Sequence, residues 1–251
     1  MMLTVVRFKN QIYMDTAMPQ EPKPKQDFER VLSTELDVRE IIASGKVESY
    51  AIRNVPFQST RFDGLKINNL SINKSSLNAT SLREICACEL KCTETAMRCA
   101  SFANAEIRSC TMMNCEAIEC DFTQALIVDS AFFETIQSNA KFDNAKLIKT
   151  KFQSVELYGA SFTFAFLAQC SFTDPKMFNA SLTRTDFTSA LIIDSDMKAA
   201  NLHASNFQNA ILIRVDLRGA NLVRADLRNA TLIDCKLNPG DLDGALVDDN
   251  I

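Results

Sequence analysis

The sequence predicts an all-β solenoid, a rod in which the chain winds through about ten stacked coils of 20 residues each. The first observation is a large apolar residue at every fifth position. Of the 41 positions between 47 and 247 whose numbers end in 2 or 7, 40 are apolar, and the exception is Gln137. The second is a small residue two positions earlier: between 95 and 245, every position ending in 0 or 5 except Pro175 holds Ala, Cys, Ser, Thr, Val or Gly. The third is that this frame never slips by a residue.

A period of five fits neither common secondary structure. On an α-helix, five residues turn the chain by about 140° beyond one full turn, which would spread the apolar residues around every face. On a flat strand, an odd step sends successive large residues to opposite faces. The pattern is satisfied when the chain turns a corner in each unit, so that four units close a square coil with the large and small residues inside. Coils spaced about 4.8 Å apart, as paired strands are, would build a rod about 50 Å long.

The phenylalanines support the square coil. Residues 20 positions apart should stack on one wall, which predicts two ladders on opposite walls: Phe102, Phe122, Phe142 and Phe162 on one, and Phe132, Phe152 and Phe172 on the other. A spacing of ten residues within this run fits the sequence equally well.

Residues 1–46 lie outside the five-residue frame, so we expect two parts, an N-terminal cap over 1–46 and the solenoid over 47–251. Three prolines between 19 and 24 indicate an extended linker. A helix is expected over 27–44, with Thr34 capping its second half and Gly45 ending it. This helix would cover the first coil, whose backbone and apolar side chains are otherwise exposed. The alternation in 3–13 predicts a strand lying against the same end.

At the other end the frame continues to Val247, and no helix is expected before Ile251. Two ways of blunting the last coil are open. Negative charge discourages edge pairing, and this end carries Asp241, Asp243, Asp248 and Asp249. The alternative is a homodimer through the C-terminal coil.

The repeat unit is clearest in Ala200-Asn201-Leu202, Gly219-Ala220-Asn221-Leu222 and Ala225-Asp226-Leu227. These segments are similar to the A(D/N)LXX motif of the pentapeptide-repeat family, and the resemblance covers residues 47–251. It implies the fold of that family, a right-handed quadrilateral β-helix. The handedness comes from the resemblance alone.

Residues able to support catalysis or metal binding are scarce. The only histidine, His203, falls on an outward position, which excludes multi-histidine metal sites and most triad chemistry. Cys86, Cys88, Cys92 and Cys99 follow no zinc-binding spacing, and five further cysteines occupy the small inward column: Cys110, Cys115, Cys120, Cys170 and Cys235. We therefore expect buried structural thiols, no metal or other cofactor, and no enzyme, since a stacked rod also has no deep cleft.

The composition also bounds the location and the partners. Nine cysteines without an export signal indicate reduced thiols and a cytoplasmic protein, although delivery by a secretion system without a cleaved signal leaves no trace in a sequence. No run of 18 apolar residues predicts a membrane span. A net charge of −4 does not predict direct binding to nucleic acid.

Surface charge gives the candidate binding site. In a 20-residue coil, one corner column carries Glu94, Glu134, Asp174, Asp194 and Asp234, and the column two residues on carries Glu116, Glu156, Asp196 and Asp216. Four bases interrupt these nine acids: Lys74, Lys176, Arg214 and Lys236. The predicted partner-binding residues are Glu134, Glu156, Asp174, Asp194, Asp196 and Asp216. The same wall holds Gln137 and Pro175, which either form a hydrogen-bonded irregularity and a corner needing no amide donor, or mark a bulge that a partner recognises.

Two functions are compatible with this surface. The first is a rigid scaffold that binds a protein partner through its outer faces. The second comes from the resemblance, because the mycobacterial fluoroquinolone-resistance protein and the Qnr type are acidic dimers that bind DNA gyrase in place of DNA. This sequence differs from that subgroup in its nearly neutral body, its lack of a C-terminal helix and its uninterrupted frame.

Overall fold

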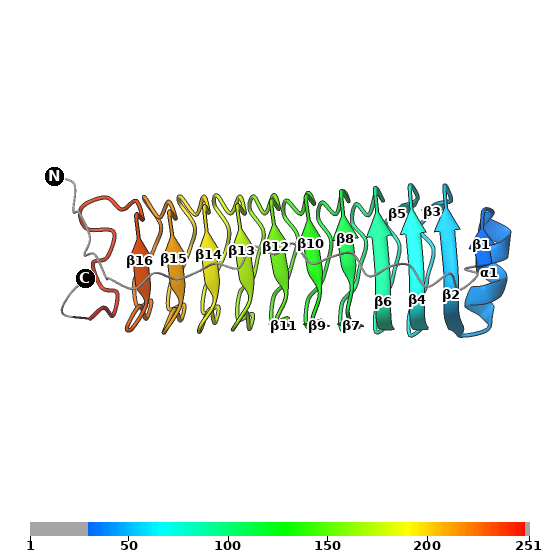
Figure 1. Cartoon of the computed structure of the whole chain (residues 1–251), viewed down its shortest axis with the longest axis horizontal. Helices are drawn as coiled ribbons and strands as arrows, with labels where there is room; N and C mark the ends of the chain where they lie inside the picture. Colours follow the sequence, from blue (N-terminus) through cyan, green and yellow to red (C-terminus); the bar gives the residue numbers. More distant parts are fainter. Residues whose placement is uncertain (1–29, 249–251) are drawn as a thin grey trace, which may run out of the picture.

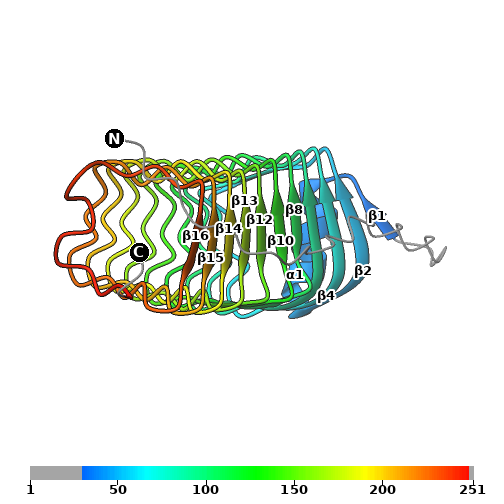
Figure 2. The same cartoon turned by 60° about the vertical axis from the view of Figure 1, so that its left-hand side comes forward.

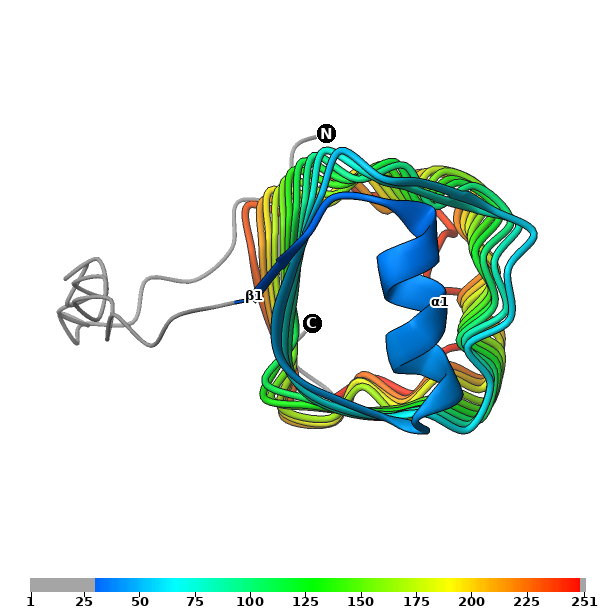
Figure 3. The same cartoon turned by 90° about the vertical axis from the view of Figure 1, so that its right-hand side faces the viewer.

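The computed structural model describes residues 30–248 of the 251-residue chain. These residues form a straight rod of stacked coils (Figures 1 and 2), and the cross-section of the rod is square (Figure 3). Each residue pairs in parallel with the residue 20 positions later, as in Phe132↔Phe152 and Phe152↔Phe172. The predicted solenoid of about ten coils is therefore confirmed, and the ten-residue spacing is excluded.

One wall of the rod is a continuous parallel sheet, here called the strand wall. It contains β1, β2, β4, β6, β8, β10 and β12–β16 in that order, with β7, β9 and β11 paired on the neighbouring wall and β3 paired with β5 (Figure 1). The strands of the sheet and its branch are β1 (Arg30–Leu32), β2 (Lys46–Arg53), β4 (Lys66–Asn73), β6 (Cys86–Thr93), β7 (Glu106–Arg108), β8 (Thr111–Met113), β9 (Leu126–Val128), β10 (Ala131–Phe133), β11 (Lys146–Ile148), β12 (Lys151–Gln153), β13 (Ser171–Thr173), β14 (Leu191–Ile193), β15 (Ile211–Ile213) and β16 (Thr231–Ile233). The separate pair is β3 (Pro56–Gln58) and β5 (Ser76–Asn78).

The corners explain the period of five. From Ser49 to Asp234, the second residue after each large inward residue adopts the left-handed backbone conformation, with φ of 59° at Asn104 and 58° at Asn144, and this turns the chain into the next wall. Glycine occupies the same position at Gly159 and Gly219, where a positive φ is free of the Cβ clash.

The interior is filled by the two predicted columns, and both phenylalanine ladders are confirmed. The rings of Phe122 and Phe142 stack with centroids 4.7 Å apart, and those of Phe152 and Phe172 with centroids 4.8 Å apart. The ladders lie on opposite walls and meet across the core, where Phe122 and Phe132 make an edge-to-face contact at 6.2 Å. Such packing fills the axis of this part of the rod with aromatic side chains.

The N-terminal end is covered by α1 (Glu35–Ala43), which lies across the square opening (Figure 3). The expected helix over 27–44 is thus shorter, because Arg30–Leu32 is strand β1, paired with β2. Pairing satisfies backbone groups that the edge of β2 would expose. Gly45 ends the helix with φ of 74°, as expected. The expected strand over 3–13 and the linker before residue 30 lie outside the described residues.

The C-terminal end has no helix among the described residues, and its apolar side chains are only half-buried: Leu232, Leu237, Leu242 and Val247. The carboxylate of Asp241 accepts the backbone N–H groups of Gly219 and Asn238, at 3.2 and 2.6 Å. Asp248 accepts that of Asn229 at 2.6 Å. These aspartates therefore bind amide donors of the last coils as well as carrying charge, while Asp249 lies outside the described part. Within 30–248, no helix is long and apolar enough to cross a membrane.

Candidate partner-binding ridge

The six predicted acidic residues lie along the corner where the strand wall meets the next wall. We call this set the ridge: Glu134, Glu156, Asp174, Asp194, Asp196 and Asp216. Three of them directly follow strands β10, β13 and β14, at the corner position with φ of 49–55°. The other three begin the next wall, where parallel bridges join Glu156, Lys176, Asp196 and Asp216 in register. The predicted alignment of both columns is present in the structure.

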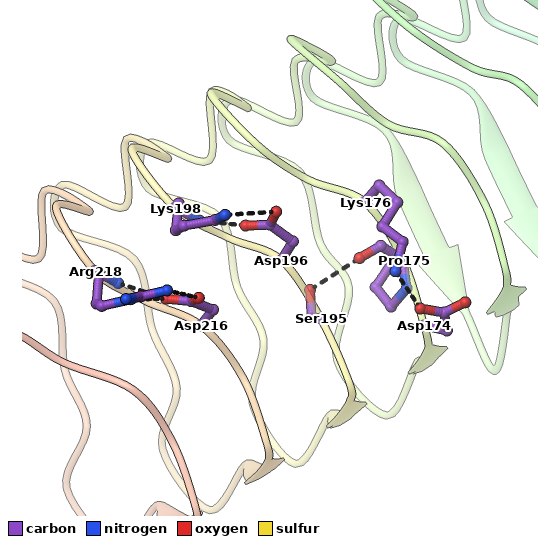
Figure 4. Close-up of polar contacts among 8 residues, drawn as sticks. All are labelled: Asp174, Pro175, Lys176, Ser195, Asp196, Lys198, Asp216 and Arg218. Carbon is purple, nitrogen blue, oxygen red and sulfur yellow. Dashed lines mark hydrogen bonds and ion pairs between the residues drawn. The ribbon is translucent and has the colours of Figure 1, made fainter.

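Four of the six ridge carboxylates are ion-paired, and Figure 4 shows three of these pairs. Asp174 binds the Lys176 ammonium group. Asp194 receives two hydrogen bonds from Arg214, at 2.6 and 2.7 Å. The remaining two pairs are Asp196 with Lys198 at 3.2 Å and Asp216 with Arg218 at 2.6 Å. The net negative charge of the ridge is therefore smaller than its acidic residues alone suggest, because each of these four carboxylates contacts a cation.

The ion pairs shift the titration of the ridge. Hydrogen bonds from Arg214 lower the pKa of Asp194, and hydrogen bonds from Arg218 lower the pKa of Asp216. The hydrogen bond to Asp174 raises the pKa of Lys176. These shifts favour the charged forms of Asp194, Asp216 and Lys176 near neutral pH.

Two cations of the ridge were missed by sequence reasoning. Lys198 and Arg218 belong to a third column, two residues beyond Asp196 and Asp216, which the charge count over two columns left out. The available signal was an acid followed two positions later by a base, since residues i and i+2 of an extended segment lie on the same side. The same spacing pairs Asp226 with Arg228 at 2.6 Å.

A hollow of about 480 Å³ opens between the last coils of the ridge. It is lined by Asp194, Ser195, Asp196, Arg214, Asp216, Asp234 and Lys236. The structure thus brings Asp194, Asp196 and Asp216 together around one concave surface. Asp174 lies one coil away, and Glu134 and Glu156 lie further along the rod with no ion pair among the described residues.

Pro175 does not distort the ridge. It is buried at a corner, and its carbonyl oxygen accepts the N–H of Asp196 at 3.2 Å and the hydroxyl of Ser195 at 3.4 Å (Figure 4). The regular register on both sides shows that the wall does not bulge. The interpretation of Pro175 as a corner residue without need of an amide donor is the one that fits.

Gln137 forms neither the hydrogen-bonded irregularity nor the bulge that the sequence left open. The side chain is fully buried, yet neither its amide nitrogen nor its oxygen has a hydrogen-bond partner. The backbone is regular, with the N–H of Gln137 donated to Glu156 at 2.7 Å. The Gln137 side chain lies in register with Ala117 and Leu157. It therefore occupies a regular inward position in a column of buried apolar side chains.

The cysteines and His203 add no site to the ridge. Burial raises the pKa of the Cys110 thiol to about 12 and that of Cys170 to about 11, so these inward thiols are unreactive. The expectation of buried thiols is wrong for Cys86, Cys88 and Cys99, which are exposed because they occupy outward positions. His203 is half-buried at an outward position. Within residues 30–248, no group of three or more His, Cys, Asp or Glu side chains is placed to hold a metal ion.

Comparison with known proteins gives a consistent picture of the fold. The family model "Pentapeptide repeats" matches residues 138–174, 180–219 and 210–246, in eight copies. No curated protein matches the sequence.

Two solved structures are similar along most of the rod. HetL, a pentapeptide repeat protein involved in heterocyst differentiation regulation from the cyanobacterium Nostoc sp. strain PCC 7120, is 20% identical, with 85% of this chain and 97% of HetL covered and a TM-score of 0.53. QnrB1, a plasmid-mediated fluoroquinolone resistance protein, is 16% identical, with 79% of this chain and 94% of QnrB1 covered and a TM-score of 0.55. At these identities the likeness concerns the fold.

Proposed function

The chain belongs to the pentapeptide repeat family, and we propose that it is a non-enzymatic scaffold that binds a protein partner through the ridge. The observation that carries the proposal is the hollow between Asp194, Asp196 and Asp216, in which carboxylates and cations alternate on a concave surface. A partner that brings arginine or lysine side chains into this hollow would exchange one ion pair for another. Electrostatic complementarity of this kind selects partners and speeds their association.

Rigidity supports a scaffold role. The ridge residues are fixed by parallel bridges between coils and by a filled core, so little conformational freedom is lost when a partner binds. The most buried thiols have raised pKa values, which favours a structural over a catalytic use of them. All nine cysteines are free, which supports a reducing compartment such as the cytoplasm as the place of action.

A homodimer through the C-terminal coil is part of the proposal. The half-buried Leu237, Leu242 and Val247 would become fully buried against the same surface of a second copy. The molecular mass in solution, measured by light scattering, tests this: a dimer that becomes a monomer in the Leu242→Asp variant supports it, and a monomeric wild type overturns it.

The partner proposal is tested by replacing ridge acids with their amides. Proteins retained from a cell extract by the wild type are compared with those retained by the triple variant Asp194→Asn, Asp196→Asn and Asp216→Asn. The matched control is Glu84→Gln, Glu89→Gln and Asp129→Asn, three exposed acids elsewhere on the rod. A partner lost only in the ridge variant supports the proposal, and one retained equally by all three proteins overturns it.

DNA gyrase is the second candidate partner. The likeness of the rod to QnrB1 favours it at the level of the fold, whereas the ion pairs of Asp194 and Asp216 make the ridge less like the phosphate backbone of DNA. A gyrase supercoiling assay decides. Inhibition that weakens in the ridge variant and persists in the control supports gyrase binding, and no inhibition at protein concentrations that saturate the enzyme removes it.

A further inference from the structure

The last three strands of the strand wall, β14, β15 and β16, lie side by side near the C-terminal end of the rod (Figure 1), and their outward side is apolar. Five of the six outward side chains on β14, β15 and β16 are aliphatic, and they form what we call the aliphatic patch: Leu191, Ile193, Ile211, Ile213 and Ile233. They are in register across the three strands, and Ile211 and Ile233 are 39% and 42% exposed. On β12 and β13 the same outward positions hold the polar residues Lys151, Gln153, Ser171 and Thr173. These polar residues separate the patch from the apolar Met113 and Phe133 further along the wall. An exposed apolar cluster of this kind marks an interaction surface.

The edge of the patch restricts what can cover it. The corner residues that directly follow β13, β14 and β16 are Asp174, Asp194 and Asp234, and Arg214 follows β15. Asp174 and Asp194 are ion-paired with Lys176 and Arg214, whereas Asp234 has no ion pair among the described residues and gives this edge its unbalanced negative charge. A complementary segment therefore needs aliphatic side chains flanked by basic ones. Over β14 and β15 it must also bind through side chains, because the backbone groups of these two strands are paired with neighbouring strands on both sides. Strand β16 is the last strand of the described sheet and is paired with β15 alone.

The chain itself contains such a segment before the described residues. Residues 3–13, with the sequence LTVVRFKNQIY, combine Leu3, Val5 and Phe8 with Arg7 and Lys9 and contain no acidic residue. We propose that residues 3–13 bind the aliphatic patch of the same chain, with Arg7 and Lys9 toward the aspartates at its edge.

The connecting chain is long enough. Strand β1 belongs to the strand wall, so the chain enters the described rod on the wall that carries the patch. Val31 and Ile211 are separated by (211 − 31)/20 = 9 coils, which at the spacing of paired strands is about 43 Å. The 16 residues from 14 to 29 span about 50 Å at the rise of an extended polyproline chain, and their three prolines favour that conformation.

The N-terminal end of the rod, where the sequence led us to expect residues 3–13, is occupied by other elements. Helix α1 lies across the opening and strand β1 pairs with the exposed edge of β2 (Figure 3). Val38 of the helix is buried there and leaves the end covered. The aliphatic patch offers residues 3–13 a surface that no described residue covers.

If residues 3–13 bind the aliphatic patch, they compete with a protein partner for the ridge. Residues 3–13 on the patch would place basic side chains beside Asp194, which also lines the hollow proposed to bind a partner. A partner of the ridge would then compete with the chain's own segment, and binding would release it. This consequence depends on the proposed function, but the binding of the segment to the patch does not.

Photo-crosslinking in the full-length protein tests the placement. With p-benzoylphenylalanine at position 5, irradiation is expected to link this position to residues 191–233 of the same chain, as identified by mass spectrometry. A mixture of ¹⁴N- and ¹⁵N-labelled protein separates links within one chain from links between two. The variant Ile213→Asp should lower the yield of these links about tenfold, the change produced by losing roughly 1.4 kcal/mol. The control Val223→Asp, an exposed substitution on another wall, should leave the yield unchanged.

A second variant leaves the rod untouched. The double substitution Arg7→Glu and Lys9→Glu should reduce the same links, because it places acids beside the aspartates of the patch edge. Links to α1, links only between two chains, or links to the patch that survive both Ile213→Asp and the double substitution would each overturn the proposal.

Discussion

The two ends of the rod are protected in different ways. At the N-terminal end, α1 buries apolar side chains, and Val38 is 2% exposed against the first coils. At the C-terminal end, the described chain continues the repeat to its last residues, leaves Leu237 and Leu242 half-buried, and satisfies backbone amides with the carboxylates of Asp241 and Asp248. The comparison teaches that the repeat specifies the interior alone, since each coil contacts only its neighbours. An end needs residues that the repeat does not contain.

The largest expected effect comes from placing a charged side chain in the core near the C-terminal end of the rod. Leu222 is 1% exposed, so Leu222→Asp would bury an unpaired carboxylate, which costs several kcal/mol. We expect the C-terminal coils to unfold while the N-terminal coils stay protected in hydrogen exchange. The adjacent outward substitution Val223→Asp should leave the protein unchanged. A thermal melting curve of Leu222→Asp equal to that of the wild type would contradict the inward assignment of this column.

A smaller loss of stability is expected from a substitution in the helix that covers the N-terminal end. Val38→Ala removes buried methyl groups between α1 and the first coils and should destabilise this end by about 2 kcal/mol. Faster hydrogen exchange is expected in β2 and β4 and not in β16. Leu36, on the same helix, is exposed, so Leu36→Ala is the matched control. Equal exchange at both ends of the Val38→Ala variant would show that the rod unfolds as one unit.

The interior and the corners could be predicted from the sequence because one physical constraint repeats. A square coil must place a large residue inside every fifth position, so the register, both phenylalanine ladders and the stacking of the ridge columns followed from residue numbers. The unpartnered amide of Gln137 did not follow, because periodicity shows that a residue points inward and not whether it finds a hydrogen-bond partner.

The ends and the charge balance of the ridge were less predictable. The sequence predicts helix at Arg30–Leu32, whereas the structure has strand β1 there. These residues pair with residues 20 positions further along the chain, and local sequence carries no signal of such a contact. The ion pairs of Lys198 and Arg218 with the ridge were missed because the charges were counted by column and not across neighbouring columns.

Acid should weaken the two ends unequally. Hydrogen bonds from Arg228 lower the pKa of Asp226 to about 2. Because this value lies below the unfolded pKa of about 3.9, the stabilisation is complete above about pH 4 and is lost as the pH falls towards 2. The described aspartates with lowered pKa values, Asp194, Asp216 and Asp226, all lie in the last coils. Between pH 5 and 2.5 we therefore expect β16 to lose exchange protection before β2, as the C-terminal coils lose about 1–2 kcal/mol of stability.

The Asp226→Asn variant should reduce this difference between β16 and β2, whereas Glu84→Gln, near the N-terminal end, should not. Loss of protection in β2 first would contradict the assignment.

The smallest expected effect concerns the carboxylate of Asp241 at the C-terminal end of the rod. Replacing it tests whether this residue protects the end by hydrogen bonding or by its negative charge. If this residue acts only through negative charge, Asp241→Ala and Asp243→Ala should be equivalent, because each removes one charge from the same exposed coil. The structure predicts that they differ: Asp241 accepts the N–H groups of Gly219 and Asn238, whereas Asp243 is exposed and accepts no N–H group within the described chain. Removing the acceptor should cost about 1 kcal/mol and speed the exchange of those two amides. Asp243→Ala should leave both amides unchanged, and Asp241→Asn, which keeps one acceptor oxygen, should lie between them. Equal exchange rates of the Gly219 and Asn238 amides in all three variants would contradict a role for the Asp241 hydrogen bonds. Negative charge alone would then protect the C-terminal end.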